Sequence, residues 1–210
     1  MDHDESRIGS ESRDALWSMV RQINLRGHAP TWTRFRNVSK SSIEYSQVAE
    51  WAESADASLG WTVSDIRPNR DDPPDCHATV TGRDVSIEVT ELVNSQLLKH
   101  VVQENRRRAH EGAPLLSTAG FYGWRHGSWT MEDLQTRLGA LVERKAGKYA
   151  ERNCRFDFLL IVTGEPWLLT TDVQTWHKEL GLPRQDQFCN IHLLLDYDPH
   201  VGRHPLFVLT

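Results

Sequence analysis

The sequence predicts an α/β protein in which a mixed central β-sheet is flanked by helices. Three observations carry this prediction. Apolar residues recur at helical spacing in residues 42–58 and 130–152, whereas residues 75–90 alternate between polar and apolar side chains, as a β-hairpin does. Residues 156–163, FDFLLIVT, are almost continuously apolar, as in a strand buried on both faces. The predicted order is an α-β-β-β-α-β core followed by a C-terminal α-β-β extension.

The first predicted elements follow from apolar spacing and from residues that end helices. A short helix at residues 15–25 should end at Gly27 and Pro30. The helix at residues 42–58 has a stripe of apolar side chains on one face. A strand at residues 60–66 and the loop RPNRDDPP then lead to the hairpin.

The elements after the hairpin show the same kinds of signal. A helical stretch is expected at residues 92–110, and a loop rich in glycine and aromatic residues follows it. The long helix at residues 130–152 should begin at Thr130, because threonine is a good N-cap and two acidic residues lie in the first turn. Strands at residues 191–197 and 205–209 complete the predicted sheet.

Length and composition favour a single folded domain. The chain has 210 residues, of which 39% are hydrophobic and 25% charged, as in ordinary folded proteins. Residues 1–12 are polar and charged, so we expect a disordered or loosely attached N-terminus before one domain at residues 13–210.

Cysteine use and hydropathy indicate the compartment. The 3 cysteines are widely spaced, so the sequence suggests neither a disulfide framework nor a zinc site. No stretch approaches the roughly 20 apolar residues that span a bilayer, and the N-terminus has no apolar signal segment. We therefore expect a soluble, cytoplasmic protein with no membrane partner.

Charge is unevenly distributed along the chain. The net charge is −5, yet residues 99–155 contain 11 lysines and arginines against 6 aspartates and glutamates. A basic middle segment is compatible with a phosphate-binding surface. The alternative is a set of solvated helix faces.

The hairpin at residues 75–90 has one polar and one apolar face on both strands. Gly82-Arg83 suits a two-residue type II′ turn, because glycine occupies the first central position. This turn would pair His77 with Glu88 and would place Asp75 diagonal to Glu88, with Cα atoms roughly 7–8 Å apart.

Asp75 and Glu88 are therefore candidate ligands of one metal ion. Carboxylate oxygens, together with waters, suit Mg²⁺ or Mn²⁺. His77, on the same face, is a candidate extra ligand or phosphate contact. The alternative is an ordinary amphipathic hairpin whose polar face lies in water.

Two further charged residues occupy inward-facing helical positions. Lys145 lies within the apolar stripe of the helix at residues 130–152, and Lys148 lies at its edge. A lysine on a buried stripe must either extend to solvent or meet an anion, here the carboxylates or a bound phosphate. Glu44 lies on the apolar side of its helix, as either a surface acid favoured by the helix dipole or an inward-facing ligand.

The arrangement of these motifs resembles the PD-(D/E)XK nuclease superfamily, which has the restriction-endonuclease-like fold. Pro74-Asp75 matches the PD of the motif, and Glu88-Val89-Thr90 matches its E-x-K except that threonine replaces the lysine. The similarity covers roughly residues 42 to 163. The motif is short, so the resemblance depends on its strand context as well.

The resemblance implies roles for individual residues. Asp75 and Glu88 would bind Mg²⁺ or Mn²⁺, and Glu44 would join them as the acid from the first helix. Some members take the lysine from the following helix, which implies Lys145 or Lys148 here. Thr90 would then remain as a substrate contact.

Substrate contacts are also expected from basic residues elsewhere. Arg106 and Arg107, in a run of three arginines, would contact a phosphate backbone or form a solvated helix end. Arg125 and His126 lie in a loop whose aromatic side chains could stack on bases or simply pack within the protein. His200 and His204 have a metal-like spacing without a partner cluster, so we expect them at the surface.

Two functions follow as hypotheses. The first is a Mg²⁺-dependent nuclease that hydrolyses phosphodiester bonds of DNA, which the resemblance favours, or of RNA. The second is a catalytically inactive module of the same fold that binds nucleic acid or a protein partner, which the missing strand lysine favours. A homodimer is compatible with the resemblance.

Overall fold

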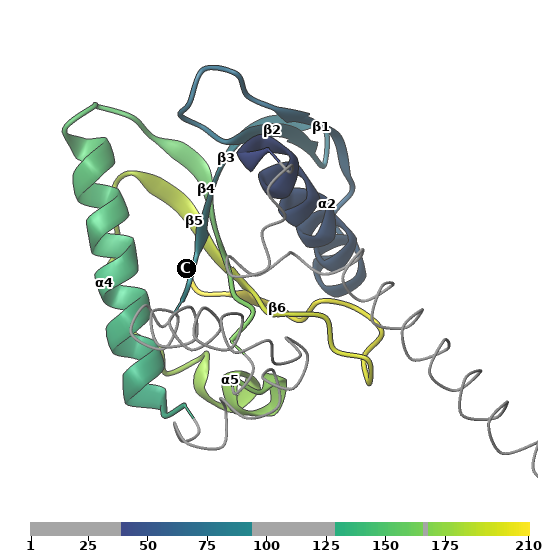
Figure 1. Cartoon of the computed structure of the whole chain (residues 1–210), viewed down its shortest axis with the longest axis vertical. Coiled ribbons are helices and arrows are strands. Elements are labelled where there is room, and N and C mark those ends of the chain that lie inside the picture. Colours follow the sequence, from purple (N-terminus) through teal and green to yellow (C-terminus); the bar gives the residue numbers. More distant parts are fainter. Residues whose placement is uncertain (1–38, 94–128, 166–167) are drawn as a thin grey trace, which may run out of the picture.

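The computed structural model describes residues 39–93, 129–165 and 168–210. In this part of the chain a six-stranded mixed sheet is flanked by three helices, which confirms the predicted α/β class and element order (Figure 1). The predicted helix at residues 15–25 and nearly all of that at 92–110 lie outside the described residues. The elements are α2 (Lys40–Leu59), β1 (Val63–Pro68), β2 (Cys76–Val80), β3 (Arg83–Glu91), α4 (Met131–Ala150), β4 (Phe156–Val162), α5 (Thr170–Trp176), β5 (Phe188–Leu194) and β6 (Leu206–Val208).

The strands follow one another across the sheet in sequence order, β1 to β6. β1, β2 and β3 are antiparallel neighbours, β3, β4 and β5 are parallel, and β6 returns antiparallel to β5. Parallel neighbours need long crossovers, which include α4 between β3 and β4 and α5 between β4 and β5. The candidate hairpin, β2–β3, therefore joins the parallel centre of the sheet directly.

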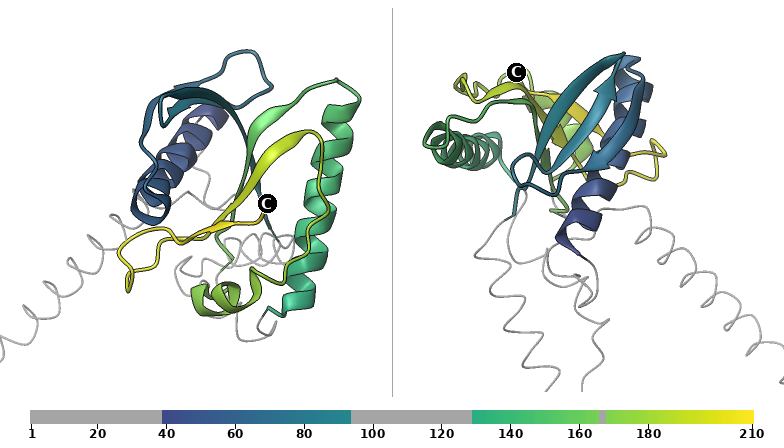
Figure 2. Two further views of the ribbon diagram at one scale, coloured as in Figure 1. Left: turned by 180° about the vertical axis from the view of Figure 1, so that it is seen from behind. Right: turned by 90° about the horizontal axis from the view of Figure 1, so that it is seen from above.

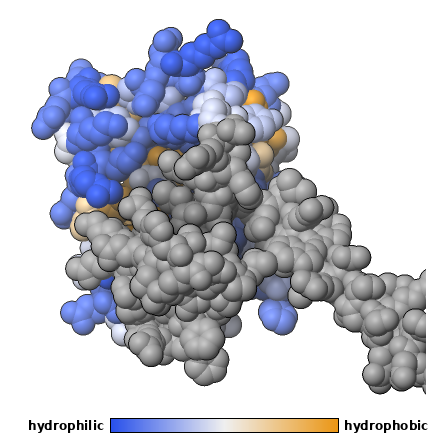
Figure 3. All heavy atoms as spheres, viewed as in Figure 1, coloured by the Kyte–Doolittle hydropathy of each residue, from blue (hydrophilic) through white to orange (hydrophobic). Residues whose placement is uncertain are grey.

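The two long helices lie on opposite faces of the sheet, with α2 on one side and α4 on the other (Figures 1 and 2). β4 confirms the predicted burial on both faces: Phe158 and Leu160 pack with Trp51 of α2, whereas Leu159 and Ile161 belong to the α4 core. No helix of the described residues has the length and hydropathy that a membrane span requires. Most of the described surface in Figure 3 is hydrophilic.

The register of the hairpin corrects the predicted turn. Val80 pairs with Arg83, so the two turn residues are Thr81 and Gly82 rather than Gly82 and Arg83. Both have positive φ, 48° and 80°, as in a type I′ turn, whose twist matches that of the strands. Because the shift is two residues, each side chain stays on its predicted face, but His77 pairs with Ser86 instead of Glu88.

The N-terminus of α4 is held by a capping box, which confirms Thr130 as the N-cap. The Thr130 hydroxyl accepts a hydrogen bond from the Asp133 N–H at 3.1 Å, and the Asp133 carboxylate accepts one from the Thr130 N–H at 3.3 Å. These bonds satisfy donors that have no partner within the helix.

Thr130→Ala should lower the free energy of unfolding by about 1 kcal/mol, because the Asp133 N–H loses its acceptor. Urea denaturation measures the difference. The matched control is Thr136→Ala, at an exposed position of the same helix, which should change stability by less than about 0.5 kcal/mol. Equal losses in both variants would contradict the capping role.

Candidate metal centre

The loop between β1 and β2 presents two aspartates to the sheet. Asn69 holds this loop: its N–H donates to the Asp75 carbonyl at 2.9 Å, and its side chain donates to the Pro74 carbonyl at 3.0 Å. Asp75 is only 4% exposed, and its Oδ2 accepts a hydrogen bond from the Val89 N–H at 2.8 Å. Asp72, three residues earlier, stays exposed at the same end of the hairpin.

Glu88 lies in the middle of the site and is almost completely buried, with 2% exposure. Its Oε1 accepts hydrogen bonds from Lys145 Nζ at 2.7 Å and from the Tyr149 hydroxyl. Its Oε2 has no hydrogen-bond partner among the described residues. A buried carboxylate oxygen without a partner carries a desolvation cost, which a bound cation would offset.

Asp72, Asp75 and Glu88 form one acidic cluster, in which one carboxylate oxygen from each lies within 4.8 Å of the others. The register agrees with this closeness: Cys76 pairs with Ile87, and the same register continued by one residue would bring Asp75 opposite Glu88 rather than diagonal to it. Three carboxylates this close fit the oxygen-only ligand sets of Mg²⁺ and Mn²⁺, and Glu88 also has one oxygen without a hydrogen-bond partner among the described residues.

Lys145 of α4 faces the cluster, at the inward position that its helical spacing predicts. Besides its contact with Glu88, its Nζ lies 3.4 Å from the Val89 carbonyl oxygen. Lys148 is more exposed, and its Nζ donates to the Tyr149 hydroxyl at 3.2 Å. Lys145 therefore contacts Glu88 directly, whereas Lys148 contacts Tyr149, which in turn binds Glu88.

Glu44 of α2 approaches the cluster from the other face of the sheet. Its Oε1 lies 3.0 Å from Lys40 Nζ, which also contacts Asp75 Oδ1 at 3.1 Å and Asp72 Oδ2 at 3.5 Å. Burial raises the pKa of Glu44 to about 7; Lys40 opposes this shift, and the Asp75 carboxylate adds to it. Glu44 is therefore connected to the acidic cluster through Lys40.

Burial also shifts the pKa values of Glu88 and Tyr149. Burial raises the pKa of Glu88; the charge of Lys145 opposes this shift, and that of Asp75 adds to it. Burial and the hydrogen bond to Glu88 raise the pKa of the Tyr149 hydroxyl. Tyr149 therefore keeps its proton and acts as a donor to Glu88.

Other predicted site residues lie at the margin of the cluster or outside the described part of the chain. His77 is half-buried opposite Ser86, and Thr90 pairs with Ile161 of β4. Neither belongs to the acidic cluster, so their substrate contacts stay predictions. The remaining predicted contacts fall outside the described residues: Arg106, Arg107, Arg125 and His126.

Sequence reasoning missed Asp72, Lys40 and Tyr149. The sequence could have indicated Asp72, because it lies in the same DDPPD run as Asp75. It could also have indicated Lys40, because a cation in the first turn of a helix is disfavoured by the helix dipole and needs another reason to be there. Tyr149 lies in the apolar stripe of α4, so the helical spacing predicts a packed ring and gives no indication that the hydroxyl binds Glu88.

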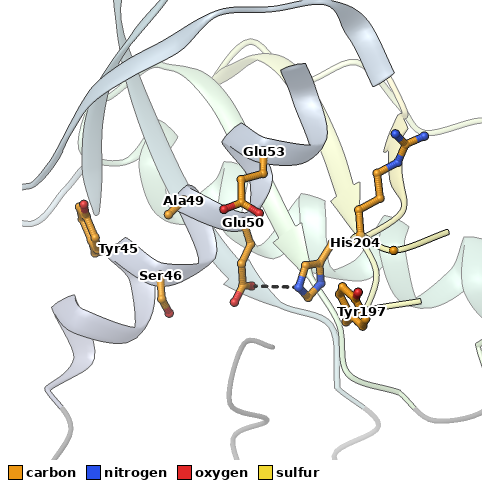
Figure 4. A pocket seen from close by; sticks show the side chains of 9 residues that line it. Tyr45, Ser46, Ala49, Glu50, Glu53, Tyr197 and His204 are labelled. Atoms are coloured by element: carbon orange, nitrogen blue, oxygen red, sulfur yellow. Dashed lines mark ion pairs between the residues drawn. The ribbon is translucent and has the colours of Figure 1, made fainter. Parts of the chain in front are cut away.

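A separate cavity of about 460 Å³ lies between α2 and residues 197–204 (Figure 4). Glu50 Oε2 and His204 Nε2 face each other across it at 3.9 Å. The prediction of a surface His204 is wrong: the residue is only 4% exposed, and its Nδ1 lies 3.0 Å from the Leu195 carbonyl oxygen. His200 is exposed, as predicted. No residue of the acidic cluster lines this cavity.

No protein-family model, curated protein or solved structure matches the chain. The resemblance to the PD-(D/E)XK superfamily therefore stays a prediction, which rests on the motif residues and their strand context.

The raised pKa of Glu44 predicts a pH-dependent stability of the metal-free protein. An unfolded glutamate ionises near 4.5, whereas folded Glu44 ionises near 7, so folding is favoured by the protonated form. Relative to Glu44→Gln, wild type should lose stability as pH rises from about 4.5 to 7, on the order of 2 kcal/mol in total. Urea denaturation in a chelator at several pH values tests this.

The control for this measurement is Glu53→Gln, at an exposed position on the same helix. Its difference in stability from wild type should stay constant over the same pH range. A constant difference for Glu44→Gln as well would show that Glu44 is solvated and does not face the cluster.

Proposed function

We propose that the protein is a metal-dependent nuclease that hydrolyses phosphodiester bonds of DNA, with RNA as the alternative substrate. One observation carries the proposal. Glu88 is buried with Oε2 unpartnered among the described residues, next to the carboxylates of Asp75 and Asp72. Its other oxygen is bound by Lys145. Such a carboxylate site with a neighbouring lysine suits phosphoryl chemistry.

Each residue would have a distinct task. Asp72, Asp75 and Glu88 would hold Mg²⁺ or Mn²⁺, which supplies an activated water and stabilises charge on the phosphate. Lys145 orients Glu88 through Oε1 and leaves Oε2 for the ion. Its ammonium would also provide the positive charge that Thr90 cannot.

The position of these residues in the fold supports the same proposal. Asp75 immediately precedes β2, Glu88 lies on the neighbouring strand β3, and Lys145 lies on α4, later in the chain. This is the order that the PD-(D/E)XK resemblance implies, with the lysine moved from the strand to the helix. The free state of all three cysteines fits a cytoplasmic location, which belongs to the same proposal.

The second candidate function is an inactive module that binds nucleic acid or a protein partner. The observation in its favour is Thr90, which stands where the motif has its lysine. Such a module would retain nucleic acid in a chelator, and Asp75→Ala would leave its affinity unchanged. A nuclease would lose cleavage under both conditions.

Wild type should cleave a mixture of DNA and RNA substrates with Mg²⁺ or Mn²⁺, and Glu88→Gln and Lys145→Ala should each lower the rate at least about 100-fold. Gel analysis of the products measures the rates. Arg144→Ala is the matched control, because Arg144 is an exposed cation next to Lys145 on α4, and it should retain activity.

The outcomes separate the parts of the proposal. If Glu88→Gln loses cleavage and Lys145→Ala retains it, the metal centre is supported and the role of Lys145 is refuted. A folded wild-type protein that cleaves no substrate with either metal would refute the nuclease and favour the binding module.

A further inference from the structure

Lys40 occupies an unusual place for a cation. It is the first residue of α2, where the positive end of the helix dipole disfavours a lysine. Its ammonium nevertheless contacts Glu44 at 3.0 Å, Asp75 at 3.1 Å and Asp72 at 3.5 Å. The carboxylates, rather than the helix, therefore hold this side chain in position.

Lys40 uses the oxygens that a metal ion would need. Asp75 Oδ2 accepts a hydrogen bond from the Val89 N–H, whereas Oδ1 is contacted by Lys40, so a metal ion bound to Oδ1 would share that oxygen with the ammonium. One oxygen of Asp72, Oδ2, also lies 3.5 Å from Lys40 Nζ. An ammonium and a divalent ion on the same oxygen repel each other, so metal binding would weaken the contacts of Lys40 with these carboxylates.

The displaced ammonium has room to move toward solvent. The Lys40 side chain is 62% exposed, whereas that of Lys145 is 18% exposed on the inner side of Glu88. Lysine has a flexible four-carbon chain with three rotatable donors. A phosphate bound next to the metal would bring negative charge between the two cations and would remove their repulsion.

We propose that Lys40 and the divalent ion alternate on Asp75 and Asp72, and that the metal-released ammonium binds a phosphate of the nucleic-acid substrate. This inference rests on the proposed function. It makes Lys40 the counter-ion of the metal-free site and a substrate-binding residue of the loaded site. The contribution of Lys40 to nucleic-acid affinity then depends on metal.

The test compares Lys40→Met with Lys178→Met, whose lysine is exposed just after α5. Titration calorimetry with Mn²⁺ should show about three- to tenfold tighter binding to Lys40→Met than to wild type, because the competing ammonium is gone. Lys178→Met should bind Mn²⁺ as wild type does. Circular dichroism checks that both variants are folded.

The second measurement uses a fluorescent DNA duplex with phosphorothioate linkages, which slow cleavage. In Mn²⁺, fluorescence anisotropy should show at least about threefold weaker binding by Lys40→Met than by wild type. In a chelator the two should bind equally, because Lys40 is then held by Asp75 and Asp72.

Unchanged or weaker Mn²⁺ binding by Lys40→Met overturns the inference, and so does an equal loss of DNA affinity with and without metal. If the inference fails in either way but wild type still binds Mn²⁺ and cleaves DNA, the proposed function stands. If neither wild type nor Lys40→Met binds Mn²⁺, the proposed function falls together with the inference.

Discussion

The buried carboxylate of Glu88 is the constraint on which the rest of the site depends. A charge on the sheet face beneath α4 needs compensation, since burial penalises the ionised form. Lys145 and Tyr149 supply it to one oxygen only. The other oxygen has no hydrogen-bond partner among the described residues, and the carboxylates of Asp75 and Asp72 lie nearby, so a cation placed among the three residues would offset the cost. The fold thus leaves one position in which a cation would be stabilised.

The sheet brings the charged groups together from both of its faces. α4 carries Lys145 to the inner side of Glu88, whereas α2 carries Lys40 and Glu44 to the side of Asp75. Asp75, at the end of the hairpin, is contacted from both elements: Lys40 of α2 binds one carboxylate oxygen, and the Val89 N–H of β3 donates to the other. Two lysines from two helices therefore flank one acidic cluster: Lys145 contacts Glu88, and Lys40 contacts Asp75 and Asp72.

Local patterns determined how much of this arrangement could be predicted. Period-two alternation identified the hairpin faces, and helical spacing identified Lys145 as inward-facing, because both depend on neighbours along the chain. The turn was predicted at Gly82-Arg83, one residue after its observed position at Thr81-Gly82, because glycine suits both the first position of a type II′ turn and the second position of a type I′ turn. The partners of Lys40 and of the Tyr149 hydroxyl could not be predicted in this way, because local spacing shows which face a residue occupies but not which residue of another element it contacts. The two contacts join residues 35 and 61 positions apart in the sequence.

In the proposed metal centre, Glu88 Oε2, Asp75 and Asp72 share one divalent ion. The most direct measurement is anomalous diffraction from crystals of the protein grown with Mn²⁺. We expect an anomalous peak about 2 Å from Glu88 Oε2 and bound by Asp75, with Lys40 Nζ no longer on Asp75. A map with Mn²⁺ bound elsewhere, or with none at saturating concentration and Lys40 still on Asp75, would contradict it.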